Sequence, residues 1–255
     1  GSCAAAAGGV TSFLDMPNNN PPVTTRERMA EKKQLAAEKS VVNYGFFIGA
    51  TPSNLEEVNS VENVCGIKIF MGASTGDLLV DDPETLEIIF ANGSKLIAVH
   101  AEDERILQEN SILMKGIDDV RIHSRIRDES AALSATKLAT RLSLKYQRRL
   151  HVLHLTTEEE CDFLRALPRD HLISTEVCPQ NFILSSPECY EHLGTKAQMN
   201  PPIRSKRHSI ALWRALKDGI IDCIATDHAP HTLAEKEQPY SLSPSGMPGV
   251  ETSLA

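Results

Sequence analysis

Five segments of the sequence place a polar or charged side chain at or near the end of an apolar run. They are the DMPNNNPP stretch of residues 15–22, Lys68 in GIKIFMG, His100 in VHAEDE, His154 in HVLHLTT and Asp227 in TDHAPH. Imidazole and carboxylate groups both suit zinc, whereas lysine is not an ordinary ligand. We predict that Lys68, His100, His154 and Asp227 form a metal site, provided the fold brings them to one rim.

Lys68 is unusual because its neighbours Ile67, Ile69 and Phe70 indicate a buried strand, where an ammonium group is costly. Burial lowers the pKa of a lysine and favours the free amine. A free amine can react with carbon dioxide to give a carbamate, which is an anion able to bridge two metals. The alternative is a lysine that extends out of the strand end or pairs with an acid.

A single histidine at the end of an apolar strand is usually a hydrogen-bonded core residue. Two of them, His100 and His154, at successive strand ends favour the role of ligands. Strand alternation alone does not exclude His151, but the strand-end position favours His154. The remaining histidines are predicted to lie on the surface in helices or loops: His123, His171, His192 and His208.

Asp227 precedes His228-Ala229-Pro230-His231, a turn expected to hold Asp227 and His231 together. A carboxylate beside a metal can bind it and also accept a proton from water. The alternative is that Asp227 caps a helix, although Pro230 makes an immediate helix less natural. Asn18 and Asn200 are neutral groups suited to an amide or imide substrate; each alone would be an ordinary turn residue near proline.

Short β-branched runs alternate with longer helical patterns, which is typical of repeated β-α units. Thr24 or Thr25 and Ser205 are expected N-caps, and Pro83 suits a first helical position. We predict strands at Val10–Asp15, Val42–Gly49, Gly66–Met71, Leu96–His100, Leu150–His154, Leu172–Val177 and Cys223–Thr226, and helices near Thr25–Lys39, Asn54–Asn63, Pro83–Ala91, Asp128–Tyr146, Thr157–Leu167 and Ser205–Lys217.

Seven β-α units predict an α/β fold, an incomplete (β/α)8 TIM-type barrel whose first strand and last helix are missing. A parallel sheet must be covered, and an open seven-stranded one exposes an edge. A doubly wound open sheet is the alternative. The barrel is preferred because its catalytic groups stand at the C-terminal ends of the strands. No linker divides residues 1–255, so we expect a single domain.

The 255 residues carry a net charge of −8, which argues against nucleic-acid binding. The two short basic clusters, Arg148–Arg149 and Arg204–Arg207, are predicted to be solvated surface, with Arg204 the one of interest. Six cysteines without C-x-x-C spacing predict a reduced, cytoplasmic protein. No apolar stretch is long enough to span a bilayer, so no membrane partner is expected.

Several motifs together resemble the dihydroorotases of the amidohydrolase superfamily: DMPNNNPP, GIKIFMG, VHAEDE, MNPPIRS, ALWRALKDGIIDCIATDHAPHTLAEKE and SGMPGVET. The resemblance implies two zinc ions in a complete active site, with Lys68 carboxylated and bridging them. His100 and His154 would complete one metal site, and Asp227 would bind the other metal. The residues implied to bind a small-molecule substrate are Asn18, Asn200, His231, Ser245 and Gly246.

The resemblance also implies the reversible hydrolysis of dihydroorotate to N-carbamoyl-aspartate in pyrimidine biosynthesis. Asp227 would take a proton from the attacking hydroxide and deliver it to the leaving ring nitrogen. The family's His-x-His pair and nearby Arg are absent and are expected before Gly1, so this polypeptide alone is expected to be inactive.

Two other functions remain open. One is a hydantoinase or allantoinase, and the other is a non-catalytic dihydroorotase-like scaffold subunit. Sequence sets no oligomeric state, and a homodimer is left open.

Overall fold

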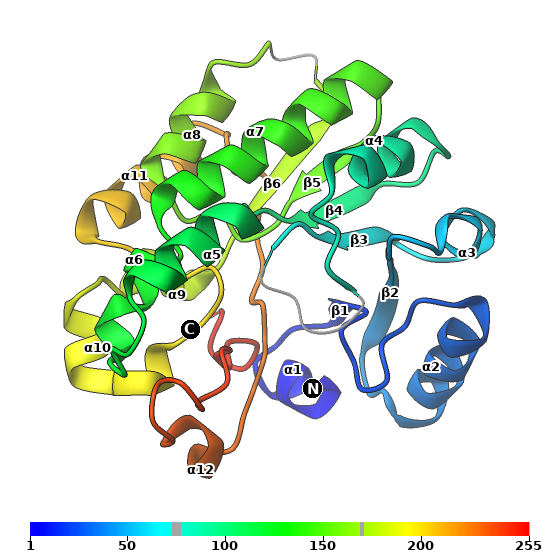
Figure 1. The fold of residues 1–255 in the computed structure, drawn as a ribbon. Coiled ribbons are helices and arrows are strands. Elements are labelled where there is room, and N and C mark those ends of the chain that lie inside the picture. Colours follow the sequence, from blue (N-terminus) through cyan, green and yellow to red (C-terminus); the bar gives the residue numbers. More distant parts are fainter. Residues whose placement is uncertain (73–77, 169–170, 255) are drawn as a thin grey trace.

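The fold is a curled sheet of seven parallel strands, each hydrogen-bonded to the next in chain order (Figure 1). The computed structural model describes residues 1–72, 78–168 and 171–254. The described strands are β1 (Ser12–Asp15), β2 (Asn43–Gly49), β3 (Gly66–Phe70), β4 (Ile97–His100), β5 (Leu150–Val152), β6 (Ile173–Val177) and β7 (Cys223–Ile224).

Helices follow most of the strands and pack along the outer face of the sheet (Figure 1). The outer helices are α2 (Arg26–Lys39), α3 (Leu55–Ser60), α4 (Pro83–Ala91), α7 (Glu129–Tyr146), α8 (Glu158–Arg165) and α11 (Lys206–Lys217). The other helical segments are α1 (Ser2–Ala7), α5 (Glu104–Leu113), η2 (Val120–Ile122), α6 (His123–Ile126), α9 (Pro179–Ile183), α10 (Glu188–Leu193), η3 (Gly194–Ala197) and α12 (Leu233–Lys236).

The predicted helix starts have clear local causes. The Thr25 side chain accepts a hydrogen bond from the Arg28 amide, and Thr157 forms a capping box with Glu160. Pro83 occupies the predicted first-turn position of α4. Ser205 precedes α11 as predicted, but its side chain makes no capping hydrogen bond. Helix α5 was not predicted.

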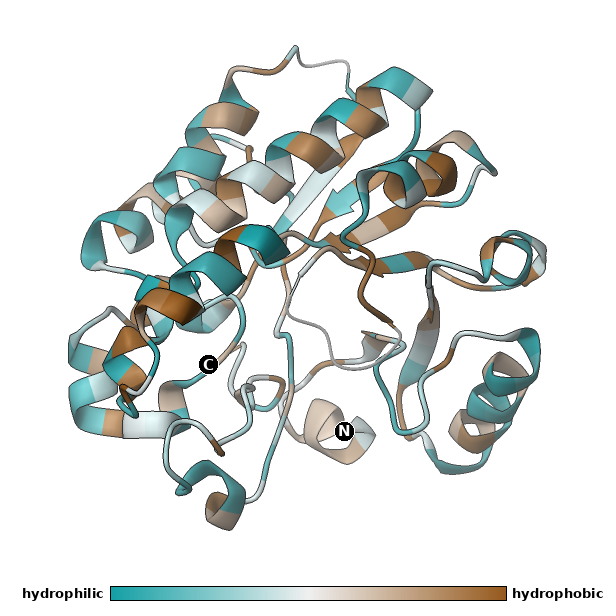
Figure 2. Cartoon of the chain, viewed as in Figure 1, coloured by the Kyte–Doolittle hydropathy of each residue, from teal (hydrophilic) through white to brown (hydrophobic). Residues whose placement is uncertain are grey.

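The main core lies between the sheet and the outer helices, where apolar side chains of both meet. In Figure 2 the outer helices carry mixed teal and brown residues, as expected of elements with one solvated and one buried face. A second, smaller apolar cluster lies on the opposite face of the sheet and includes Phe47, Ala98 and Leu153. Lys68 pairs in register with Ala98, so it belongs to this inner face.

The incomplete (β/α)8 barrel is confirmed, and the doubly wound alternative is wrong. A doubly wound sheet reverses its strand order at one point and carries helices on both faces. Here the strand order never reverses, and the outer helices cover one face. The single-domain prediction stays a proposal, which the one continuous sheet supports.

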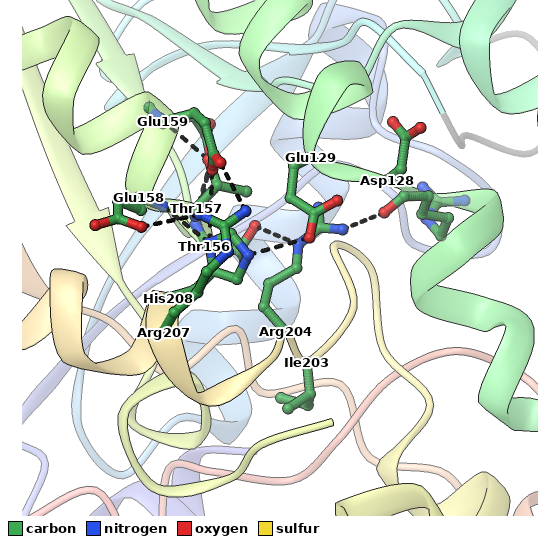
Figure 3. Close-up of polar contacts among 12 residues, drawn as sticks. Asp128, Glu129, Thr156, Thr157, Glu158, Glu159, Ile203, Arg204, Arg207 and His208 are labelled. Atoms are coloured by element: carbon green, nitrogen blue, oxygen red, sulfur yellow. Dashed lines mark hydrogen bonds and ion pairs between the residues drawn. The ribbon is translucent and has the colours of Figure 1, made fainter. Parts of the chain in front are cut away.

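Four residues predicted to lie on the surface are buried instead: His123, Arg148, Arg204 and His208. His208 bonds to the Glu158 amide and to Glu129, linking α11 to α8 and α7 (Figure 3). The Arg148 guanidinium donates to the carbonyls of Lys95 and Asn92. Sequence reasoning missed these residues because long-range partners, rather than neighbours in sequence, satisfy their polar atoms. His171 and His192 do keep solvent access.

Strands β1 and β7 are the two edges of the described sheet. Helix α1 lies beside the C-terminal segment, since a Cβ added at Gly8 would meet Val250 and Glu251. Within the described residues, no helix is both long and apolar enough to cross a lipid bilayer.

Candidate metal and substrate site

The predicted metal ligands lie at the C-terminal ends of the strands or just within them. His100 is the last residue of β4, Lys68 lies within β3, and His154 and Asp227 follow β5 and β7. His154 and Asp227 have φ angles of 38° and 42°. Positive φ angles are uncommon for non-glycine residues, although His and Asp adopt them more often than most, and such residues cluster at functional sites. These angles also explain why β5 and β7 end two residues earlier than predicted.

His100 and His154 are in direct contact, with His100 Nδ1 lying 3.0 Å from His154 Nε2. His100 Nε2 lies 2.7 Å from a carboxylate oxygen of Glu102 and therefore donates to it. Burial lowers the pKa of both imidazoles, so both are neutral near pH 7. His100 Nδ1 is then an acceptor that points toward His154.

Glu102 is the main site residue that sequence reasoning missed, although it lies within VHAEDE. Its side chain is fully buried and contacts both His100 and the Arg127 guanidinium. Burial alone would raise the pKa of Glu102, but the Arg127 guanidinium, assisted by His100, holds it far below its usual value. The Arg127 backbone carbonyl in turn accepts a hydrogen bond from Arg204. A carboxylate that accepts from the distal nitrogen of a histidine is the usual arrangement behind a metal ligand.

Lys68 is almost fully buried on the inner face, and its Nζ lies 4.4 Å from the centre of the Phe70 ring. Burial lowers the pKa of Lys68 strongly, and the charges of Asp227 and Glu176 offset only part of this effect. The free amine is therefore much more accessible than in an ordinary lysine. The alternative of a lysine that extends out of the strand does not fit this burial.

Asp227 is electrostatically linked to Lys68. Burial among the surrounding protein atoms raises the pKa of the Asp227 carboxyl, Lys68 lowers it, and Glu176 raises it further. Asp227 also keeps exposed surface beside the edge strand β7. This solvent access limits how far burial raises the pKa of its carboxyl group. A carboxyl with a raised pKa is suited to take up and release a proton near neutral pH.

The donor set fits a metal of the zinc type. His154 Nδ1 and Glu102 Oε1 are buried atoms without a hydrogen-bond partner among the described residues. Two neutral imidazoles, one backed by a carboxylate, are in the protonation state that binds metal. Lys68 and Asp227 would add a carbamate and a carboxylate.

Three of the five predicted substrate-binding residues lie together beside the turn that follows Asp227. His231 Nε2 lies 3.3 Å from the Ser245 carbonyl oxygen. Gly246 adopts a φ of 145°, and a Cβ there would lie 2.6 Å from the Ala229 carbonyl oxygen and 3.0 Å from His231 Nε2. Asn18 is exposed in the loop after β1.

Asn200 is held by His123, another residue that sequence reasoning missed. His123 Nε2 lies 2.9 Å from the Met199 carbonyl oxygen and 3.0 Å from Asn200 Oδ1, while Nδ1 lies 3.0 Å from the Tyr240 hydroxyl. Burial lowers the pKa of His123 to about 4, so the ring is neutral. Its Nε2–H donates toward Asn200, and its Nδ1 accepts from Tyr240.

No protein-family model matches the chain. Among curated proteins, a dihydroorotase of Methanosarcina acetivorans is 39% identical over 268 residues, covering 100% of this chain and 56% of that protein. A dihydroorotase of Halobacterium salinarum is 36% identical over 260 residues, with 100% and 59% covered. This chain is a homologue of dihydroorotases. The resemblance inferred from its motifs is confirmed. The chain spans between half and two thirds of the length of the dihydroorotases that it matches.

Related enzymes with other names are also similar. An allantoinase of Streptomyces avermitilis is 33% identical over 261 residues, covering 98% of this chain and 58% of that protein. Among solved structures, an L-hydantoinase of Arthrobacter aurescens superposes with a TM-score of 0.93 at 28% identity, with 98% and 58% of the two chains covered. The dihydroorotase homologue therefore shares its fold with a hydantoinase.

Proposed function

We propose that the full-length protein is a zinc-dependent dihydroorotase that reversibly hydrolyses the cyclic amide of dihydroorotate to N-carbamoyl-aspartate, in pyrimidine biosynthesis. The proposal rests on the buried pair of neutral histidines backed by Glu102. Lys68 acts electrostatically on both histidines and is in turn linked to Asp227. The dihydroorotase names of several relatives support the choice of substrate.

Lys68, His100, His154 and Asp227 would hold two zinc ions together with residues from outside this chain. Carboxylation of the Lys68 amine would turn a costly buried cation into an anionic ligand. When bound, zinc supplies Lewis-acid activation of a carbonyl group and of water. Glu102 would orient His100 and keep its Nδ1 deprotonated.

Asp227 is the proposed catalytic residue. Its carboxylate would accept a proton from the attacking water and deliver it to the ring nitrogen as the amide bond breaks. Asn18, Asn200, His231, Ser245 and Gly246 would bind and orient the substrate. His123 would act as a positioning residue by holding the Asn200 side chain.

The 255-residue polypeptide by itself is proposed to be inactive, because the His-x-His pair and Arg that the family uses are not part of its sequence. A cytoplasmic location agrees with six cysteines that all lack a disulfide partner. We also propose a homodimer of the full-length protein.

Hydantoinase or allantoinase activity is the second candidate, favoured by the structural similarity to a hydantoinase. The test is turnover by the full-length protein of dihydroorotate, hydantoin and allantoin, with metal content measured on the same sample. Preferred turnover of dihydroorotate, lost in Asp227→Asn, is expected. Preference for either other substrate would replace the proposal with the second candidate. A metal-free protein that turns over none of the three would favour a scaffold subunit.

A further inference from the structure

A second group of potential ligands lies on the inner face of the sheet, separate from the four predicted ones. His151, Glu176 and Cys223 each offer one ligand atom, and these atoms all lie within 4.8 Å of one another. The Glu176 charge also acts on Lys68 and Asp227, but none of the three residues belongs to the four predicted ligands.

Strand register explains why these side chains meet. His151 pairs with Ala98, which belongs to the inner-face cluster, and also with Ser174. Glu176 lies two residues after Ser174, so alternation along β6 returns it to the same face. Glu176 pairs in turn with Cys223 on β7. The three side chains therefore come from three adjacent strands and point to one side.

The His151 ring is held in a defined orientation. Its Nδ1 lies 2.8 Å from the Ser174 hydroxyl, and that hydroxyl is 3.4 Å from the Leu150 carbonyl oxygen. If Ser174 donates to Leu150, then His151 Nδ1–H donates to Ser174. In that arrangement His151 Nε2 presents a lone pair to a Glu176 carboxylate oxygen only 3.0 Å away.

The lone pair of His151 Nε2 and the Glu176 carboxylate oxygen repel each other at 3.0 Å unless a proton or a metal ion lies between them. The side chains of His151 and Glu176 are only 14% and 12% exposed, so water compensates little. Cys223 is exposed and adds a sulfur atom. Among the residues that the structure describes, its thiol makes one weak contact, with the Thr175 carbonyl oxygen at 3.8 Å. Imidazole nitrogen, carboxylate oxygen and thiolate sulfur together form a set typical of zinc.

We propose that His151, Glu176 and Cys223 form an additional site for one zinc-type divalent cation, distinct from the Lys68, His100, His154 and Asp227 set. The ion connects β5, β6 and β7. Its mechanical role follows from the fold, because β7 has only two residues paired with β6 and no other neighbour among the described strands. The fourth coordination position is open to water or to a residue outside the described chain.

The test uses cobalt, because a thiolate ligand gives Co²⁺ a charge-transfer absorption that nitrogen and oxygen ligands do not. The full-length protein is stripped with a chelator and titrated with Co²⁺. The thiolate band is expected in the parent protein, lost in Cys223→Ser and kept in Cys3→Ser, which changes a cysteine that is also exposed. Glu176→Gln should weaken cobalt binding while keeping the sulfur.

The Lys68→Ala variant distinguishes a failure of this proposed metal site from a failure of the proposed active site. The thiolate band should survive in Lys68→Ala even when hydrolysis is lost, and it should be present even if the protein turns over no cyclic amide. Melting temperature gives a second readout: zinc should raise it more in Cys3→Ser than in Cys223→Ser. The proposal would be overturned if the parent protein gave no thiolate band at saturating Co²⁺, or if the band persisted in Cys223→Ser. The contact between His151 and Glu176 would then be a simple hydrogen bond.

Discussion

The contact between His100 and Glu102 gives the candidate site much of its chemical character. The carboxylate fixes which imidazole nitrogen carries the proton, and Arg127 keeps that carboxylate charged in a buried position. A metal ligand without this support would have to give up a proton or reorient on binding.

Glu102→Gln in the full-length protein is therefore expected to lower zinc affinity by roughly 10- to 100-fold, the usual effect of removing such a supporting group. Competition with a chelating dye measures the affinity. Glu109→Gln, which changes an exposed glutamate on α5, is the control. Equal affinities for the two variants would show that Glu102 does not tune the site.

Gly246→Ala tests the proposed substrate contacts. A Cβ at Gly246 would lie 2.6 Å from a backbone oxygen of the turn that carries His231, so the loop must shift. Such strain amounts to about 1–3 kcal/mol, and we expect KM for dihydroorotate to rise about 10-fold or more with metal content unchanged.

Gly116→Ala is the matched control, because Gly116 also has a positive φ but has open space around its added Cβ. Both variants carry backbone strain, and only Gly246→Ala carries a clash beside His231. A normal KM in Gly246→Ala would argue against a substrate contact there.

At the scale of elements, α7, α8 and α11 are joined by polar contacts as well as by their apolar faces. Buried His208 on α11 bonds to Glu129 at the start of α7 and to the backbone at the start of α8 (Figure 3). The His208 hydrogen bond is the largest factor that lowers the pKa of Glu129, to about 2. This contact helps to hold the helices that support β5 and β6.

A lowered folded-state pKa means that the ionised Glu129 stabilises the fold above its unfolded pKa of about 4.5, and that this contribution is lost as pH falls toward 2. Glu129→Gln should therefore flatten the loss of stability over this pH range. The expected contribution is roughly 1 kcal/mol, since the partly exposed side chain is screened by solvent. Urea unfolding at several pH values measures it.

Glu62→Gln, at an exposed loop position, provides the control and should leave the pH dependence unchanged. If Glu129→Gln and Glu62→Gln have the same stability profile between pH 4.5 and 2, the His208–Glu129 contact does not connect the helices energetically.

At the scale of the whole molecule, the described sheet has two unpaired edges, β1 and β7. Unpaired strand edges with exposed apolar residues favour association between chains. Ile224 on β7 is 51% exposed and lies at such an edge. The polypeptide of residues 1–255 is therefore expected to self-associate as its concentration rises.

Ile224→Lys should shift this polypeptide toward the monomer, because a charged edge residue opposes pairing. Ile210→Lys is the control: Ile210 on α11 is 53% exposed but lies away from the sheet edges. Sedimentation velocity over a range of concentrations distinguishes them. Equal association of both variants would place the contact elsewhere on the surface.

Local patterns in the sequence were enough to predict the β-α order, the cap at Thr25, and the four candidate ligands at strand ends. These features depend on short-range periodicity and on residue type, which are visible in any stretch of about ten residues. The incomplete barrel followed from counting β-α units.

Only the tertiary structure decided which side chains support the candidate ligands. Glu102 meets Arg127 across 25 residues, His123 meets Asn200 across 77, and Glu176 meets both His151 and Cys223 from neighbouring strands. The burial of Arg148, Arg204 and His208 was likewise not visible in sequence. Contacts of this kind depend on strand register and on helix packing, which no local pattern encodes.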